Sequence, residues 1–215
     1  MMLTFDFCIP EAQKLADLTG ASLDLNSALK YCDLHIEIDV EEEGIDMHEL
    51  IRRESMRQGL SRAAIVTYAR CWGSGVRRPL SEDLVPQLTS SSRNTHKQVI
   101  DIRNKWAAHS VNHFDDVRVN VQVNDGADES GRISVGVQSQ SVTGFRQAFM
   151  IPMRTLCREV EQLVQVELRL EYAQVTALAR SMKFEEILRR ERIDGVAFGE
   201  RELTATKVAR RFESR

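Results

Sequence analysis

The sequence predicts a mainly α-helical fold, built as an antiparallel helical bundle that carries one inserted β-hairpin. Two observations predict it: apolar residues recur at helical spacing along much of the chain, and apolar and polar residues alternate strictly within about 117–142. The chain has 215 residues, of which 42% are hydrophobic and 28% are charged. That length and composition suit one domain with a substantial core and argue against long disorder. We expect the domain to span 1–195, followed by a charged peripheral tail at 196–215.

The first two helical patterns lie before the basic part of the chain. After Pro10, apolar residues recur near helical spacing at Leu15, Leu18, Leu25, Ala28, Leu29 and Cys32. We expect one or two helices there, loosened at Gly20, and then an acidic loop through 41–44. Asp46 and Glu49 form a capping-box pattern, which predicts a second helix ending near Trp72. The expected buried positions of that helix are Leu50, Leu60, Ala64, Ile65 and Tyr68.

Three further elements follow along the chain. N-cap candidates at 89–92 predict a helix over roughly 92–110 that contains Val99, Ile102 and Trp106. Two alternating runs on either side of a polar loop predict a half-buried β-hairpin at about 117–142; its apolar members are Val117, Val119, Val121, Val123, Ile133, Val135 and Val137. The last pattern predicts a long helix from about 152 to 192 with a heptad-like seam of Leu156, Val160, Leu163 and Leu170.

Several functional classes are disfavoured by features that the sequence lacks. The N-terminus has neither a basic region nor an apolar stretch of signal-peptide length, and no apolar run approaches the roughly 20 residues of a membrane span. The four cysteines are widely scattered and form no Cys-x-x-Cys pair, which disfavours a disulfide framework or a zinc site. We therefore expect a cytoplasmic protein without a membrane partner.

Charge is distributed very unevenly along the chain. The net charge is −3, but residues 1–51 hold 12 acidic and 2 basic residues, whereas residues 52–110 hold 11 basic and 4 acidic ones. The near-neutral total therefore does not argue against a nucleic-acid partner. It suggests a basic groove that is balanced by an acidic N-terminal region.

The most informative motif lies within the basic block, at 101–110. It reads Asp-Ile-Arg-Asn-Lys-Trp-Ala-Ala-His-Ser, so that Arg103 is followed by the polar Asn104 and, after five intervening residues, by His109. This arrangement resembles the motif of the HEPN superfamily (higher eukaryotes and prokaryotes nucleotide-binding domains). The Arg-Asn-Lys and Ala-Ala-His context is similar to abortive-infection-type bacterial members. The β-hairpin after the motif is not part of the minimal HEPN pattern.

The resemblance implies an HEPN-like helical bundle that acts as a homodimer. It also implies a metal-independent endoribonuclease, with Arg103, Asn104 and His109 as catalytic residues and with a role as a toxin or antiviral-defence effector. RNA would be the substrate, and an antitoxin or another regulatory protein would be a further partner. The resemblance also leaves room for a non-catalytic member that binds a nucleotide, RNA or protein, because fold membership does not deliver activity.

The residue types suit cleavage of RNA by attack of the ribose 2′-OH on the adjacent phosphorus. A histidine titrates near neutrality and can move a proton, and an arginine grips phosphate oxygens and stabilises developing charge. On an α-helix, Arg103 and His109 are separated by about 120° in azimuth and about 9 Å along the axis, which makes one copy a poor compact site. Two copies related by symmetry would bring both pairs into one cleft, and the small Ala107 and Ala108 would let the helices approach closely.

Weaker candidates for RNA or phosphate binding are Lys105, His96 and Arg93. His96 precedes Arg103 by seven residues and so shares its helical face, although a surface role also fits it. A purely structural interpretation is also open: Asp101 and Lys105 match an ordinary i,i+4 pair, and His109 suits a helix C-terminus. In that case, the acidic N-terminal block would cover the basic block of the same or a neighbouring chain.

A metal site is a further, weaker alternative. His109 and His113 are four residues apart and lie near two acids, Asp115 and Asp116. We expect these two acids in the turn before the first strand instead. No phosphate-binding glycine loop is present, so we expect neither a metal nor a cofactor.

Overall fold

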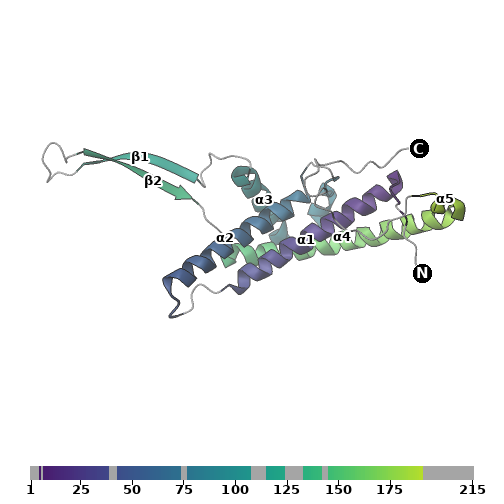
Figure 1. Ribbon diagram of the computed structural model, residues 1–215, viewed down its shortest axis with the longest axis horizontal. Helices are drawn as coiled ribbons and strands as arrows, with labels where there is room; N and C mark the ends of the chain where they lie inside the picture. The colour runs from purple at the N-terminus through teal and green to yellow at the C-terminus, as the bar shows by residue number, and fades with distance from the viewer. Residues whose placement is uncertain are drawn as a thin grey trace.

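The computed structural model describes residues 5, 7–38, 43–73, 77–107, 115–123, 133–141 and 145–190. The described chain is mainly helical, which confirms the predicted class. The elements in chain order are η1 (Pro10–Ala12), α1 (Gln13–Glu37), α2 (Met47–Arg70), η2 (Glu82–Gln87), α3 (Ser90–Ile102), the π-helical turn η3 (Arg103–Ala107), β1 (Asp115–Val123), β2 (Ile133–Ser141), α4 (Gln147–Ser181) and α5 (Phe184–Leu188). Figure 1 shows α1, α2 and α4 as long rods lying side by side, with α3 across them.

Helix α1 runs unbroken through Gly20, where the sequence predicts a loosening. A side chain at this position would overlap the guanidinium of Arg77. Glycine therefore lets Arg77 lie across α1 and reach the carboxylate of Asp24. The glycine thus allows Arg77 to approach α1 closely, although the two are distant in sequence. The surrounding helical contacts keep α1 intact at this position.

Helix α2 begins as the capping pattern predicts. Asp46 is the N-cap, and its carboxylate accepts a 2.9 Å hydrogen bond from the backbone N–H of Glu49. The Glu49 carboxylate accepts bonds from Arg52 and Arg53 on the next turn. Hydrogen bonds from these two guanidinium groups lower the pKa of Glu49 to about 2. The acid thus remains charged and pairs with two arginines of the basic block, whose combined charge it halves.

The core lies where α1, α2, α3 and α4 meet. Its largest fully buried side chains include Leu25, Ile65, Tyr68, Met150, Met153, Leu156, Val99 and Val160. In the predicted seam of α4, Leu156 and Val160 are buried and Leu163 is partly buried, whereas Leu170 is 55% exposed. The heptad-like pattern therefore continues further along α4 than the helices that cover it.

Helix α4 begins at Gln147, one turn earlier than the sequence predicts, and ends at Ser181. Pro152 suggests the start of a helix, but the preceding turn contributes Met150, which is fully buried, and Phe149, which packs against the core. Burial of these side chains holds a helical turn in front of Pro152, although the proline lies inside the helix and removes one of its backbone hydrogen bonds. Past the break at the end of α4, only the short helix α5 follows among the described residues.

Strands β1 and β2 pair as an antiparallel ribbon that projects from the helices (Figure 1). Asp115 and Asp116 are the first residues of β1, so the prediction that they form a turn before the strand is wrong. Val121 and Val123 are each 62% exposed, and Val135 is 69% exposed. For these three residues the predicted half-burial is also wrong, because none of the helices that the structure describes covers the ribbon there.

Some predicted features lie outside the described residues. These are residues 41 and 42 of the acidic loop, the C-terminal part of the motif helix, and the tail at 196–215. Among the helices that the structure does describe, none is long and apolar enough to cross a membrane.

Two leucines on α4 provide a test of the core. We expect Leu156→Ala to lower the free energy of unfolding by about 2–5 kcal/mol, because it removes a fully buried side chain and leaves a cavity. Leu170→Ala, on the exposed part of the same helix, is the matched control and should change stability by less than about 0.5 kcal/mol. Urea unfolding followed by circular dichroism measures both. Equal losses would contradict this assignment of the core.

Candidate functional site

Contacts at both ends of α3 position the predicted site. At its start, the Thr89 hydroxyl accepts a 3.3 Å hydrogen bond from the backbone N–H of Ser92. Thr89 is itself held by Glu159 of α4, to which its backbone N–H and hydroxyl each donate at 3.0 Å. Towards the other end, Val99 is buried and Ile102 packs against the core. The helix is therefore fixed on α4, and its last turn has a defined direction.

Arg103 and Asn104 lie at the end of this helix, and both are exposed. The Arg103 Nη1 donates a 3.0 Å hydrogen bond to the Asn104 side-chain oxygen. The two side chains therefore face the same region of solvent. A guanidinium held by an amide at the surface is suited to bind a phosphate, because its remaining N–H groups stay available.

The π-helical turn η3 begins at Arg103. Such a turn closes its hydrogen bonds between residues i and i+5, so it is wider than an α-helical turn. The angle of about 120° around the helix axis between Arg103 and His109 was calculated for a regular α-helix. It therefore does not apply to a segment that contains a π-helical turn. Single π-helical turns within helices are frequent at functional sites, because they redirect side chains.

His109 and Ala108 lie outside the described residues, as does His113. The backbone of Ala107 belongs to η3. The structure therefore places Arg103 and Asn104 of the predicted catalytic set together, while the position of the histidine stays a prediction.

His96 lies in the core, so the interpretation of it as a phosphate-binding or surface residue is wrong. It is 7% exposed, and its Nδ1 is 2.8 Å from the Tyr68 hydroxyl. Its ring packs edge-on against Trp72, with the centroids 4.6 Å apart. Burial lowers the pKa of His96, which keeps the imidazole neutral. His96 and Arg103 are joined by regular α-helix, but His96 is covered by α2 whereas Arg103, at the end of α3, is exposed.

The other predicted phosphate contacts have different surroundings. Arg93 is half-buried, and its Nη1 donates a 3.0 Å hydrogen bond to the backbone oxygen of Pro86. Lys105 is exposed on η3, beside Arg103 in sequence. Lys97 is an exposed cation on α3 that the sequence analysis did not single out. Its spacing of four residues from Arg93 is the signal that would have found it, because i and i+4 share a helix face.

Ion pairs between the two charge blocks engage four arginines with two carboxylates and so offset part of their positive charge. Asp24 of the acidic block pairs with Arg77 and lies 3.7 Å from Arg70. Glu49 pairs with Arg52 and Arg53, as described above. The basic block therefore offers less positive surface than its composition suggests, and Arg103 is not a member of these pairs.

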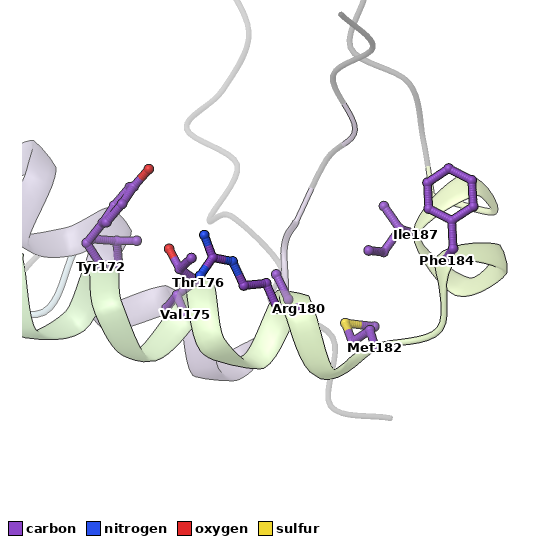
Figure 2. A pocket seen from close by; sticks show the side chains of 9 residues that line it. Tyr172, Val175, Thr176, Arg180, Met182, Phe184 and Ile187 are labelled. Carbon is purple, nitrogen blue, oxygen red and sulfur yellow. The ribbon is translucent and has the colours of Figure 1, made fainter.

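Three grooves in the described part of the chain are lined by residues other than Arg103, Asn104 and Lys105. The groove of about 530 Å³ in Figure 2 lies between the end of α4 and α5 and is mainly apolar, with Tyr172 and Phe184 at its rim. A groove of about 410 Å³ carries charges of both signs, including Lys14, Asp17 and Arg78. A third, of about 420 Å³, is apolar and lies between α1 and α2.

The described residues include no group of three or more histidine, cysteine or acidic side chains that could hold a metal ion. Comparison with known proteins gave no match: no protein-family model, no curated protein and no solved structure matches the chain.

A second histidine, His35, is fully buried at the end of α1. Its Nε2 donates a 2.7 Å hydrogen bond to the backbone oxygen of Phe145, which ties α1 to the start of α4. Burial, and then the charge of Arg57, lower the pKa of His35. His35 and His96 are therefore both neutral groups that the folded state holds against protonation.

We expect acid to destabilise the fold through these histidines. Because the pKa of His96 is lower in the folded state than the 6.5 of a free imidazole, the unfolded chain binds more protons below that pH. The stabilising contribution is complete above pH 6.5 and is lost as the pH falls from there towards the folded pKa. Thermal unfolding between pH 7 and 5 measures the slope. His96→Gln should reduce it, and Gln98→Ala, at an exposed position on the same helix, should leave it unchanged.

Proposed function

We propose that this chain is a metal-independent endoribonuclease of the HEPN type, with Arg103, Asn104 and His109 as its active site. The observation that carries the proposal is the exposed Arg103–Asn104 pair, joined by a 3.0 Å hydrogen bond at the start of a π-helical turn. The mainly helical fold around it agrees with an HEPN-like bundle. The motif resemblance supplies the third residue, His109.

Arg103 holds the scissile phosphate in this proposal. Its guanidinium stays charged at every accessible pH and presents several N–H donors to the phosphate oxygens. As the ribose 2′-OH attacks phosphorus, negative charge grows on those oxygens, and a cation already in place stabilises that charge most. Asn104 fixes the direction of the guanidinium through its side-chain oxygen and so reduces the reorganisation needed.

His109 moves the proton. An imidazole near its ordinary pKa takes the proton of the 2′-OH as the oxygen attacks phosphorus, and a protonated imidazole can return a proton to the departing 5′-oxygen. The products are a 2′,3′-cyclic phosphate and a 5′-hydroxyl, so no water or metal enters the cleavage step. A second copy of the chain supplies the second histidine, as the resemblance implies, and lets one imidazole accept while the other donates.

Two substitutions test the proposed chemistry. We expect Arg103→Ala to slow RNA cleavage by at least about a hundredfold, as loss of a transition-state donor does in other enzymes. His109→Ala should abolish cleavage. A labelled single-stranded RNA incubated with the purified chain in EDTA provides the assay, and gel separation shows the products.

Arg169→Ala is the matched control, because Arg169 is also an exposed helical arginine but lies on α4. It should cleave RNA like the unmodified chain, and all variants should keep the same helical circular dichroism. Full activity of His109→Ala would contradict the assignment. Binding of RNA without cleavage by the unmodified chain would instead identify a binding module that uses the same residues.

A further inference from the structure

The groove between the end of α4 and α5, which we call the α4–α5 groove, has a polar row of side chains beside an apolar one. Tyr172, Thr176 and Arg180 follow one another at intervals of four residues, so they lie in one row along α4. Val175 and Ala179, also four residues apart, form the neighbouring row. Both rows line the same groove of about 530 Å³.

The far wall of the α4–α5 groove is apolar. Met182 lies at the break that follows α4, and Phe184 and Ile187 belong to α5. In Figure 2 the Arg180 side chain runs back along α4, so that its guanidinium lies on the side of Thr176 and away from α5. The cation and the apolar wall therefore lie at opposite ends of the groove.

The polar end of the groove is complementary to an anion. Arg180 is the one charged side chain among the nine residues that line the groove, and it has no ion-pair partner among the described residues. Its guanidinium stays protonated and presents a fork of N–H donors that matches the two oxygens of a carboxylate. The hydroxyl groups of Tyr172 and Thr176, in the same row, are further hydrogen-bond donors.

The rest of the groove is complementary to an apolar chain. Phe184 is 69% exposed and the ring-bearing Tyr172 is 65% exposed, so a ligand that covers them removes apolar surface from water. Pockets for small ligands have volumes of about 300–1,000 Å³ and combine a mostly apolar lining with a few polar groups. The α4–α5 groove agrees with both properties.

We propose that the α4–α5 groove binds a medium-chain aliphatic carboxylate, with its anionic head on Arg180 and its chain against α5. The separation of the cation from the apolar wall selects a ligand with its charge at one end. Because such a ligand contacts α4 and α5 together, it links the two helices across the break at Met182. The groove includes neither Arg103 nor Asn104, so this site does not rest on the proposed nuclease.

Isothermal titration calorimetry of the full chain with decanoate, below the concentration at which decanoate forms micelles, tests the site. We expect saturable binding of one decanoate per chain. Decanol has the same chain length without the charge, and it should bind at least about tenfold more weakly because it cannot form charge-assisted hydrogen bonds with the guanidinium.

Substitutions separate the two ends of the groove. Arg180→Gln should weaken decanoate binding at least about tenfold and leave decanol binding unchanged. Arg169→Gln, an exposed arginine of the same helix outside the groove, is the matched control and should bind both ligands like the unmodified chain. Ile187→Ser, on the apolar wall, should weaken the binding of both ligands. Circular dichroism checks that each variant keeps its helical content.

Three results would overturn the proposal. The first is a lack of saturable decanoate binding, and the second is decanoate binding that Arg180→Gln leaves unchanged. The third is binding to vesicles of anionic phospholipid without binding of free decanoate, which would assign this surface to a membrane instead. RNA cleavage is measured separately, so an unmodified chain that binds decanoate without cleaving RNA would refute only the nuclease, and the reverse result would refute only the carboxylate site.

Discussion

The contact between α1 and α4 is the interaction on which the rest of the structure depends. Its centre is apolar, with Leu25 and Leu156 fully buried, and its margin is polar, where the Ser22 hydroxyl donates a 2.8 Å hydrogen bond to Glu161. Helix α4 then holds α3 on another side through Glu159, which binds the cap of α3. Helix α4 is therefore shared by the core and by the segment that carries the motif. Because the cap fixes where α3 starts, it also determines where Arg103 emerges.

The ion pairs of the fold make the basic block less positive at the surface than its composition suggests. Charges of opposite sign that are neutralised within the chain contribute little field outside it, and exposed pairs of this kind add little stability. Asp24 and Glu49 each pair with two arginines of the block. The positive charge that is left to attract a phosphate is therefore confined to a smaller surface than the 11 basic residues of this block suggest. The acidic N-terminal region thus supplies counter-charges to the basic block within the same chain.

Much of the fold follows from periodicity and capping, and the differences have identifiable causes. Asp46 and Thr89 start helices because local side-chain to backbone bonds set those ends. The burial of His96 could not be predicted from its spacing. It depends on a tertiary contact with Tyr68, and a polar residue such as histidine is usually expected at the surface. The directions of the side chains after Ile102 could not be predicted either, because nothing in the motif indicates a π-helical turn. Alternation in the ribbon predicts an apolar face, but it does not say whether that face meets the same chain or another one.

The Arg103–Asn104 pair is exposed at the end of α3. An Arg–Asn pair that is open to solvent can bind a phosphate, but catalysis needs groups held around it and water kept away. The three described grooves do not include this pair, so the described residues leave it open to solvent, and in the proposed function a second copy and the RNA enclose it.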